Sequence, residues 1–160
     1  MEYQILREMF EGEEPKSVFE IGCGGAGLLK DVSDHFGCKV GGMDISKVRM
    51  ENANNVFPDV KFLIHDLNDP WPLEDKSFDI VFSVCTLAYL LNPELAIKEM
   101  TRVGKKVIIA EYHQDNIPDT ILKAILSDRE EKFIIRDYKK LIEGDFKTSS
   151  TNRTIIKWPK

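Results

Sequence analysis

The chain has 160 residues, of which 42% are hydrophobic and 31% charged, and its formal net charge is −5. This composition is typical of one globular domain and excludes collagen-like, low-complexity and fully disordered chains. No apolar run reaches the ~20 residues of a membrane-spanning helix. We therefore expect a single domain without a membrane span.

The distribution of cysteine and charge narrows the class of protein. The three cysteines and three histidines are scattered, without the paired spacing of a zinc site or the even count of a disulfide framework. From residue 132 onward the chain has eight basic and three acidic residues. This basic stretch indicates either a site for an anionic partner or lysines that solvate a strand edge and a helix face. We favour the second interpretation, and predict no metal site, no nucleic-acid partner and a cytoplasmic location.

Helix and strand patterns alternate along the chain, which predicts an α/β sheet with crossover helices. Apolar spacing and capping residues predict helices over residues 1–11, 28–36, 46–56 and 92–103. Short apolar runs predict five strands, namely Ser17–Ile21, Cys38–Met43, Val60–Ile64, Phe78–Ser83 and Lys106–Ala110.

The pattern after residue 111 is less regular. Two apolar stripes predict short helices over residues 121–126 and 138–142, and residues 146–150 and 154–158 predict an antiparallel hairpin at the sheet edge. The single domain is therefore expected to comprise an N-terminal helix (1–16), a core (17–111), and lid helices with the edge hairpin (112–160).

A glycine-rich turn follows the first predicted strand and precedes a helix. Gly22, Gly24 and Gly27 satisfy the G-x-G-x-x-G pattern, in which glycine permits positive φ and the close approach of a ligand. Asp44 follows Gly22 by 22 residues at the end of the next strand, where a carboxylate can accept both hydroxyls of a ribose. These residues alone predict a site for a nucleoside cofactor.

Two further acids bear on which cofactor it is. Glu20 precedes the first glycine, where its charge would repel a pyrophosphate but suits a ligand that carries an ammonium and a sulfonium. Asp66 ends the third strand, where it can receive an adenine amino group while the N–H of Leu67 meets a ring nitrogen. Because the carboxyl ends of parallel strands meet at one edge, we expect Glu20, Asp44 and Asp66 to line one crevice.

This pattern resembles the class I S-adenosylmethionine-dependent methyltransferases. The resemblance covers residues 17–111 and rests on the segments Val18–Gly24, Val40–Ser46, His65–Asp66 and Phe78–Ser83. It implies a three-layer, Rossmann-like α/β sheet, mostly parallel with a C-terminal antiparallel hairpin, in the strand order 3-2-1-4-5-7-6. The chain departs from the family at Ala26, where many members have glycine, and at residues 103–105, which replace a usual Pro-Gly-Gly.

The resemblance also implies a cofactor, S-adenosyl-L-methionine, and its product, S-adenosyl-L-homocysteine. It implies that Glu20 orients the glycine turn and the methionine ammonium. It also implies that Asp44 holds the ribose hydroxyls and that Asp66 binds the adenine amino group. The other implied cofactor contacts come from Gly22, Cys23, Gly24, Ile45, Leu67 and Ser83. Each acid also has a structural alternative, as a helix cap, a turn residue or an acceptor for loop amides.

The acceptor side is less defined. Methyl transfer from a sulfonium is an in-line displacement that needs alignment and desolvation, with a base only where the acceptor must lose a proton. Candidate acceptor-side residues follow the fourth and fifth strands and are Tyr89, Glu111, Tyr112 and His113. Residues 83–86 lack the Asn/Asp-Pro-Pro-Tyr motif of family members that methylate exocyclic or amide nitrogens. We expect a small-molecule acceptor, with a protein partner as an alternative.

Three functions are therefore compared. The first is a methyltransferase, the second a nicotinamide-binding Rossmann domain, and the third a methyltransferase-like domain that binds a cofactor or partner without catalysis. Glu20 and the predicted hairpin argue against the second. An assay of methyl transfer would distinguish the methyltransferase from the domain that binds without catalysis.

Overall fold

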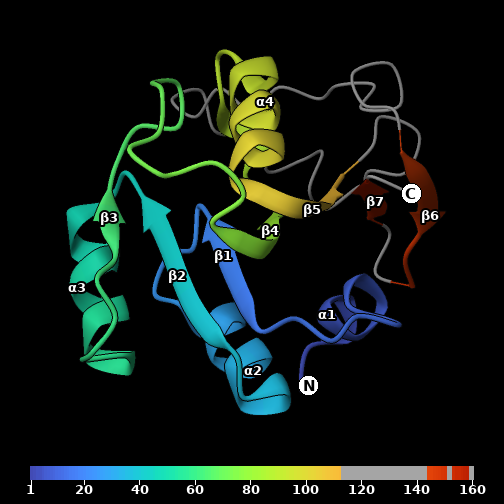
Figure 1. Ribbon diagram of the computed structural model, residues 1–160, viewed down its shortest axis with the longest axis horizontal. Coiled ribbons are helices and arrows are strands. Elements are labelled where there is room, and N and C mark those ends of the chain that lie inside the picture. Colours follow the sequence, from blue (N-terminus) through green and yellow to red (C-terminus); the bar gives the residue numbers. More distant parts are fainter. Residues whose placement is uncertain (113–143, 151–152, 159–160) are drawn as a thin grey trace, which may run out of the picture.

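The computed structural model describes residues 1–112, 144–150 and 153–158 (Figure 1). Its centre is a seven-stranded sheet with the order β3-β2-β1-β4-β5-β7-β6, as predicted. Strands β1 to β5 are parallel, whereas β7 runs antiparallel to both β5 and β6. The strands are β1 (Ser17–Ile21), β2 (Lys39–Asp44), β3 (Leu63–Ile64), β4 (Phe78–Val84), β5 (Gly104–Glu111), β6 (Asp145–Thr148) and β7 (Thr154–Trp158).

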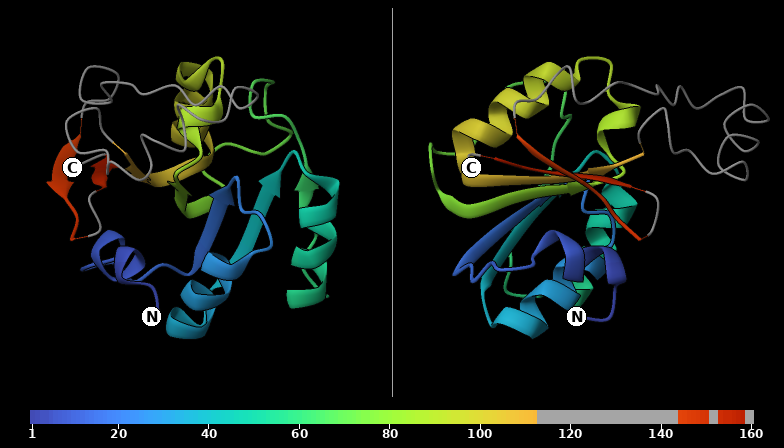
Figure 2. Two further views of the ribbon diagram at one scale, coloured as in Figure 1. Left: turned by 180° about the vertical axis from the view of Figure 1, so that it is seen from behind. Right: turned by 90° about the vertical axis from the view of Figure 1, so that its right-hand side faces the viewer.

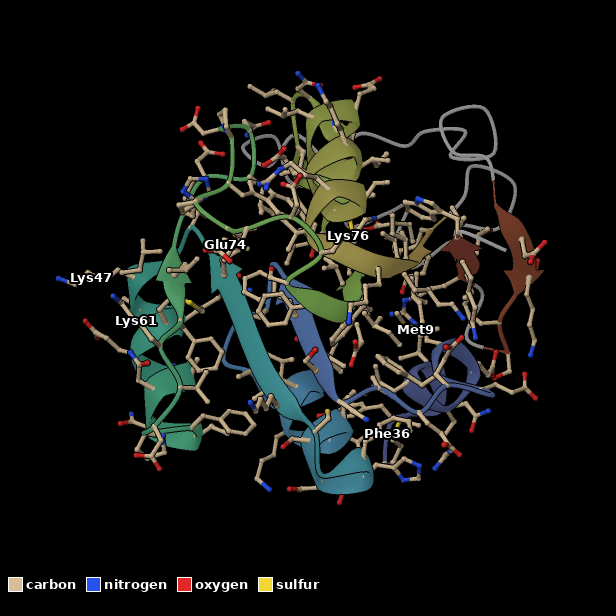
Figure 3. All side chains as sticks on the ribbon, viewed as in Figure 1. Met9, Phe36, Lys47, Lys61, Glu74 and Lys76 are labelled. Atoms are coloured by element: carbon tan, nitrogen blue, oxygen red, sulfur yellow. The ribbon has the colours of Figure 1, made fainter. Side chains whose placement is uncertain are left out.

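Helices cover both faces of this sheet and complete three layers (Figure 2). One face carries α1 (Gln4–Met9), α2 (Gly27–Phe36) and α3 (Lys47–Val56), and the other carries α4 (Pro93–Val103) with the short 3-10 helix η1 (Leu87–Tyr89). Alternate strand side chains point to opposite faces, so the hydrophobic core divides into two clusters. Met9 of α1 and Phe36 of α2 are labelled in Figure 3; Met9 belongs to the first cluster, and Phe36 is partly buried and packs against that cluster. The predicted fold class is confirmed.

Capping residues fix the helix ends that the sequence predicts. The Ser46 hydroxyl accepts the N–H of Arg49 at 3.4 Å at the start of α3, and the Asn92 side chain accepts the N–H of Leu95 at 3.2 Å at the start of α4. The Nζ of Lys76 reaches the end of α4 (Figure 3) and donates to the carbonyls of Thr101 and Gly104 at 2.7 and 2.8 Å.

Two predicted elements are shorter than expected. The predicted strand Val60–Ile64 contains only the two residues of β3, because β3 has a single neighbour and the chain before it turns, with the N–H of Val60 on the Phe57 carbonyl. The predicted helix over residues 1–11 is α1 alone, because the Asp31 carboxylate holds the two residues before it by their N–H groups. The two helices predicted over residues 121–126 and 138–142 lie outside the described residues.

The segment that follows α1 contacts β5 and the β6–β7 hairpin through ion pairs. Glu13 accepts hydrogen bonds from Lys106 at 2.9 Å and from Lys157 at 3.3 Å, and Glu11 pairs with Lys147 at 2.8 Å. These three lysines, one each on β5, β6 and β7, thus have acidic partners within the chain itself.

Candidate functional site

A cavity of about 590 Å³ opens where β1, β2, β3 and β4 end. Six residues predicted from the sequence line it, namely Gly22, Asp44, Ile45, Asp66, Leu67 and Tyr89. The other lining residues are Ser46, Arg49, Asn68, Val84, Cys85, Thr86 and Leu90. A larger hollow of about 830 Å³ lies between α1 and the end of α2, but it contains none of the predicted site residues.

Asp44 ends β2 and holds the glycine turn against it. Its Oδ2 accepts the N–H of Gly24 at 3.0 Å, and its Oδ1 accepts the N–H of Ser46 at 2.9 Å. The carboxylate is only 8% exposed but still lines the cavity. Each carboxylate oxygen has a second lone pair, so Asp44 can bind these amides and also accept hydroxyl groups from a ligand.

Asp66 lies across the cavity from the glycine turn, in the loop after β3. Its Oδ1 accepts both the N–H and the side-chain amide of Asn68, at 2.9 and 2.8 Å. Its Oδ2 has no hydrogen-bond partner among the described residues, and it can therefore receive a donor from the cavity. The side-chain oxygen Oδ1 of Asn68 in turn accepts the N–H groups of Leu91 and Asn92 at 3.2 Å, which joins this loop to the loop before α4.

Glu20 lies inside β1, two residues before the glycine turn, and is 2% exposed. Its Oε2 is buried and has no hydrogen-bond partner in the described part of the chain. Burial raises the pKa of this carboxyl well above its ordinary value, and the charge of Asp44 raises it further. A cationic donor reaching this oxygen would restore the carboxylate, because it would offset both effects.

Gly22 and Thr86 bring the ends of β1 and β4 into close contact. Gly22 has φ +64°, and a Cβ at this position would lie 2.3 Å from Oγ1 of Thr86. Only glycine therefore fits both the backbone conformation and the space. The hydroxyl of Thr86 donates weakly to the carbonyls of Ile21 and Val84, at 3.4 and 3.3 Å, so this side chain is fixed against the turn.

The remaining predicted cofactor contacts lie behind the cavity wall. Cys23 is buried, and burial raises the pKa of its thiol, which makes it a packed side chain and not a nucleophile. Ser83 is fully buried inside β4, and its Oγ has no hydrogen-bond partner among the described residues. The three residues after Ser83 reach the cavity instead. The assignments of Cys23, Gly24 and Ser83 to the cofactor stay predictions.

The predicted acceptor-side residues take different positions. Tyr89 is 51% exposed at the cavity. Glu111 is fully buried at the end of β5, where its Oε1 accepts the N–H groups of Thr86 and Leu87 at 2.7 and 2.8 Å. Tyr112 is half-buried and turned toward the hairpin. His113 lies outside the described residues. Their roles toward an acceptor also stay predictions.

Several residues of this region were not singled out from the sequence, among them Arg49, Asn68, Thr86 and Arg153. Arg49 carried one signal, because a cation in the first turn of a helix opposes the helix dipole and so suggests another purpose. Asn68 and Thr86 act through loop contacts that no spacing encodes. Arg153 comes from the hairpin and reaches Cys85, 68 residues earlier in the chain.

Within the described residues, no group of three or more histidine, cysteine, aspartate or glutamate side chains could hold a metal ion. The same residues include no helix that is long and apolar enough to cross a bilayer.

Comparison with known proteins gives one family match and several related chains. The family described as "Methyltransferase domain" matches residues 19–107. Sterol 4-C-methyltransferase strm-1 from Caenorhabditis elegans is 30% identical over 120 residues, which cover 69% of this chain and 35% of that protein. The chain thus spans about a third of the length of this relative.

Two solved structures share the fold at low identity. The PH0226 protein from Pyrococcus horikoshii OT3 aligns with a TM-score of 0.73 and 19% identity, over 98% of this chain and 86% of that one. A chain of the complex that contains the Haloferax volcanii Trm112 methyltransferase activator aligns with a TM-score of 0.72 and 22% identity, over 86% of this chain and 66% of that one.

Proposed function

Since this chain belongs to the methyltransferase domain family, we propose that it binds S-adenosylmethionine in the 590 Å³ cavity and transfers the methyl group to a small-molecule acceptor. The bound cofactor would supply an activated methyl group on a sulfonium. The chain would supply binding, orientation and exclusion of water.

The observation that carries this proposal is the buried, unpartnered Oε2 of Glu20. Glu20 does not itself line the cavity as the sequence predicts, but it is near enough to Asp44, which does, to be affected by the charge of that residue. An isolated buried acid is costly unless a partner compensates it. The ammonium of a methionine moiety is such a partner, whereas the pyrophosphate of a nicotinamide cofactor would add repulsion. Glu20 therefore supports the methyl donor over a dinucleotide.

The other residues fit the rest of this cofactor. Asp44 would accept the ribose hydroxyls on the lone pairs that Gly24 and Ser46 leave open. Asp66 would accept the adenine amino group on its Oδ2. Ile45 is 66% exposed at the cavity, and an adenine ring would cover this apolar side chain.

A small-molecule acceptor is supported by one relative, which is a sterol 4-C-methyltransferase. A protein partner is the alternative, since one structural neighbour comes from a complex with a methyltransferase activator. Methyl transfer needs no catalytic triad, because the acceptor attacks the methyl carbon in line with the departing sulfur. Alignment above the ends of β4 and β5 is therefore the main task of the acceptor side.

The test is a calorimetric titration of the chain with S-adenosylhomocysteine, with NAD as control. We expect saturable binding of the first compound alone. Glu20→Gln should weaken this binding about tenfold or more, because it removes the charge that pairs with the ammonium. Glu51→Gln is the matched control, since Glu51 is exposed on α3 and should leave the affinity unchanged. Binding of NAD alone, or equal affinity of Glu20→Gln and wild type, would refute the proposal.

Catalysis is tested separately with radiolabelled S-adenosylmethionine. The label should pass into a small-molecule fraction of a cell extract. Transfer into protein alone would refute the small-molecule acceptor. Binding without any transfer, both alone and with extract proteins added, would identify a domain that binds the cofactor without catalysis.

A further inference from the structure

We infer that Arg153 recognises an anionic group, a carboxylate or a phosphate, on the methyl acceptor. This inference rests on the proposed function, because it assigns the acceptor side of the same site. Arg153 precedes β7 and is half-buried. Its guanidinium donates from Nε to the Cys85 sulfur at 3.0 Å and from Nη2 to the Tyr112 hydroxyl at 2.9 Å.

Arg153 is half-buried, and no carboxylate of the described residues lies within ion-pair distance of it. Within residues 1–112, 144–150 and 153–158, Arg153 forms no ion pair, although Arg102 pairs with Glu99 and Asp75, and Lys157 pairs with Glu13. Glu111 is near enough to favour the charged form of Arg153, but its Oε1 accepts two backbone N–H groups. Burial lowers the pKa of Arg153, but Cys85, Tyr112 and Glu111 raise it on balance, so the guanidinium stays a cation with which an anionic ligand can pair.

Arg153 also has N–H donors that its contacts with the described residues leave unused. A guanidinium has five N–H groups, and the protein contacts use two of them. One face of the group lies 4.7 Å from the centre of the Tyr112 ring. The plane is thereby fixed, while donors on Nη1 and Nη2 have no acceptor in the described part of the chain. A fixed planar fork of this kind matches the two oxygens of a carboxylate or phosphate.

The position of Arg153 at the sheet edge also suits contact with an acceptor. Because β7 is antiparallel to β5, with Thr154 opposite Glu111, Arg153 emerges at the same sheet edge where the parallel strands end. It contacts Cys85, which lines the cavity at the end of β4. Asp44 and Asp66 lie at the far side, beyond β1. Arg153 is therefore on the side of the cavity that the adenosine does not need.

The backbone holds Arg153 and Cys85 in place. The N–H of Arg153 donates to the Ser149 hydroxyl at 3.0 Å, and the N–H of Ser149 donates to the Arg153 carbonyl at 2.7 Å. Cys85 has φ +52°, which is rare for a residue with a side chain, and its N–H donates to the Ala110 carbonyl at 2.9 Å. Strained residues that the surrounding structure holds in this way are often found at ligand sites.

The experiment measures binding of three probes to the full chain saturated with S-adenosylhomocysteine. Benzoate and phenyl phosphate carry the two anionic groups, and benzamide is the neutral analogue. We expect at least one anion to bind about tenfold or more tightly than benzamide, as a charge-assisted hydrogen bond implies. Preference for one anion over the other identifies carboxylate or phosphate as the group recognised.

Variants test whether Arg153 is responsible. Arg153→Met should reduce anion affinity about tenfold or more, and Arg153→Lys should retain part of it because the charge remains. Arg7→Met removes the same charge from the exposed face of α1 and should have no effect. If Arg153→Met binds S-adenosylhomocysteine with unchanged affinity, its fold is intact. If Arg153→Met does not fold, Arg153→Lys takes its place in the comparison with the wild type.

Equal binding of all three probes by the wild type, or full anion affinity in Arg153→Met, would overturn the inference and leave Arg153 as a link between the hairpin and β4. This failure differs from a failure of the proposed function, in which the wild-type chain would not bind S-adenosylhomocysteine at all.

Discussion

The contact between Gly22 and Thr86 allows a prediction whose size follows from the structure. In Gly22→Ala, the new methyl group would lie 2.3 Å from Oγ1, 2.5 Å from Cγ2 and 2.9 Å from Cβ of Thr86. The left-handed backbone, with φ +64°, costs about 1–2 kcal/mol for alanine. The forced repacking adds about 1–3 kcal/mol. We therefore expect the free energy of unfolding to fall by about 2–5 kcal/mol, measured by urea denaturation.

Two comparisons isolate the steric part of this loss. Gly37 has nearly the same backbone, φ +61°, but nothing lies within 4 Å of the added Cβ, so Gly37→Ala should show only the conformational cost of about 1–2 kcal/mol. Adding Thr86→Ala to Gly22→Ala removes Oγ1 and Cγ2 and should recover most of the difference, as a favourable coupling in a double-mutant cycle. The reasoning fails if Gly22→Ala costs no more than Gly37→Ala, or if Thr86→Ala restores nothing.

Three further predictions concern carboxylates. Asp44→Ala should abolish measurable S-adenosylhomocysteine binding and lower the free energy of unfolding by about 2–3 kcal/mol, because two hydrogen bonds to a charged group are lost; calorimetry and urea denaturation check both. The raised pKa of Glu20 means that the folded chain keeps a proton that the unfolded chain releases. Wild-type stability should therefore fall relative to Glu20→Gln as the pH rises from about 4.3 toward the higher folded pKa, and a pH-independent difference would contradict this. Glu13→Gln should cost about 1 kcal/mol in the same denaturation assay, since its carboxylate binds two lysines near the core. Glu11→Gln should leave stability unchanged, because the ion pair between Glu11 and Lys147 is exposed to solvent. Equal losses of stability in Glu13→Gln and Glu11→Gln would contradict this difference between the two acids.

The side of the cavity where we propose that the cofactor binds could be located from the sequence, because parallel strands bring their carboxyl ends to one edge. Glycine spacing located the turn, and the positions of Asp44 and Asp66 after successive strands then placed both acids at the cavity. Ser83 shows the limit of this reasoning. The fourth strand continues through Val84, so Ser83 is enclosed between Ile21 and Ile109 and the next residues reach the cavity.

The contacts of Glu111, Tyr112 and Arg153 could not be predicted, because they join segments far apart in the chain. Tyr112 and Arg153 meet only through the antiparallel return of β7 beside β5. No periodicity relates a residue after one strand to a residue before another. The pairing of Glu111 with the N–H groups after β4 has the same origin, since it depends on how the turn at Thr86 folds back.

Backbone strain shows why local sequence rules fail near the cavity. Gly22 and Gly24 have positive φ, as the glycine pattern implies, but so do Ala26 and Cys85, whose side chains disfavour that conformation. Each is held by a backbone bond, from the N–H of Ala26 to the Cys23 carbonyl and from that of Cys85 to Ala110, both at 2.9 Å. These two turns follow β1 and β4, the adjacent strands whose ends form the centre of the site. The strained backbone costs about 1–3 kcal/mol of stability at each of these turns. At both places the chain turns sharply, which leaves the strand ends open to a ligand. Because the surrounding sheet enforces that turn, propensity read from either residue alone predicts the wrong backbone.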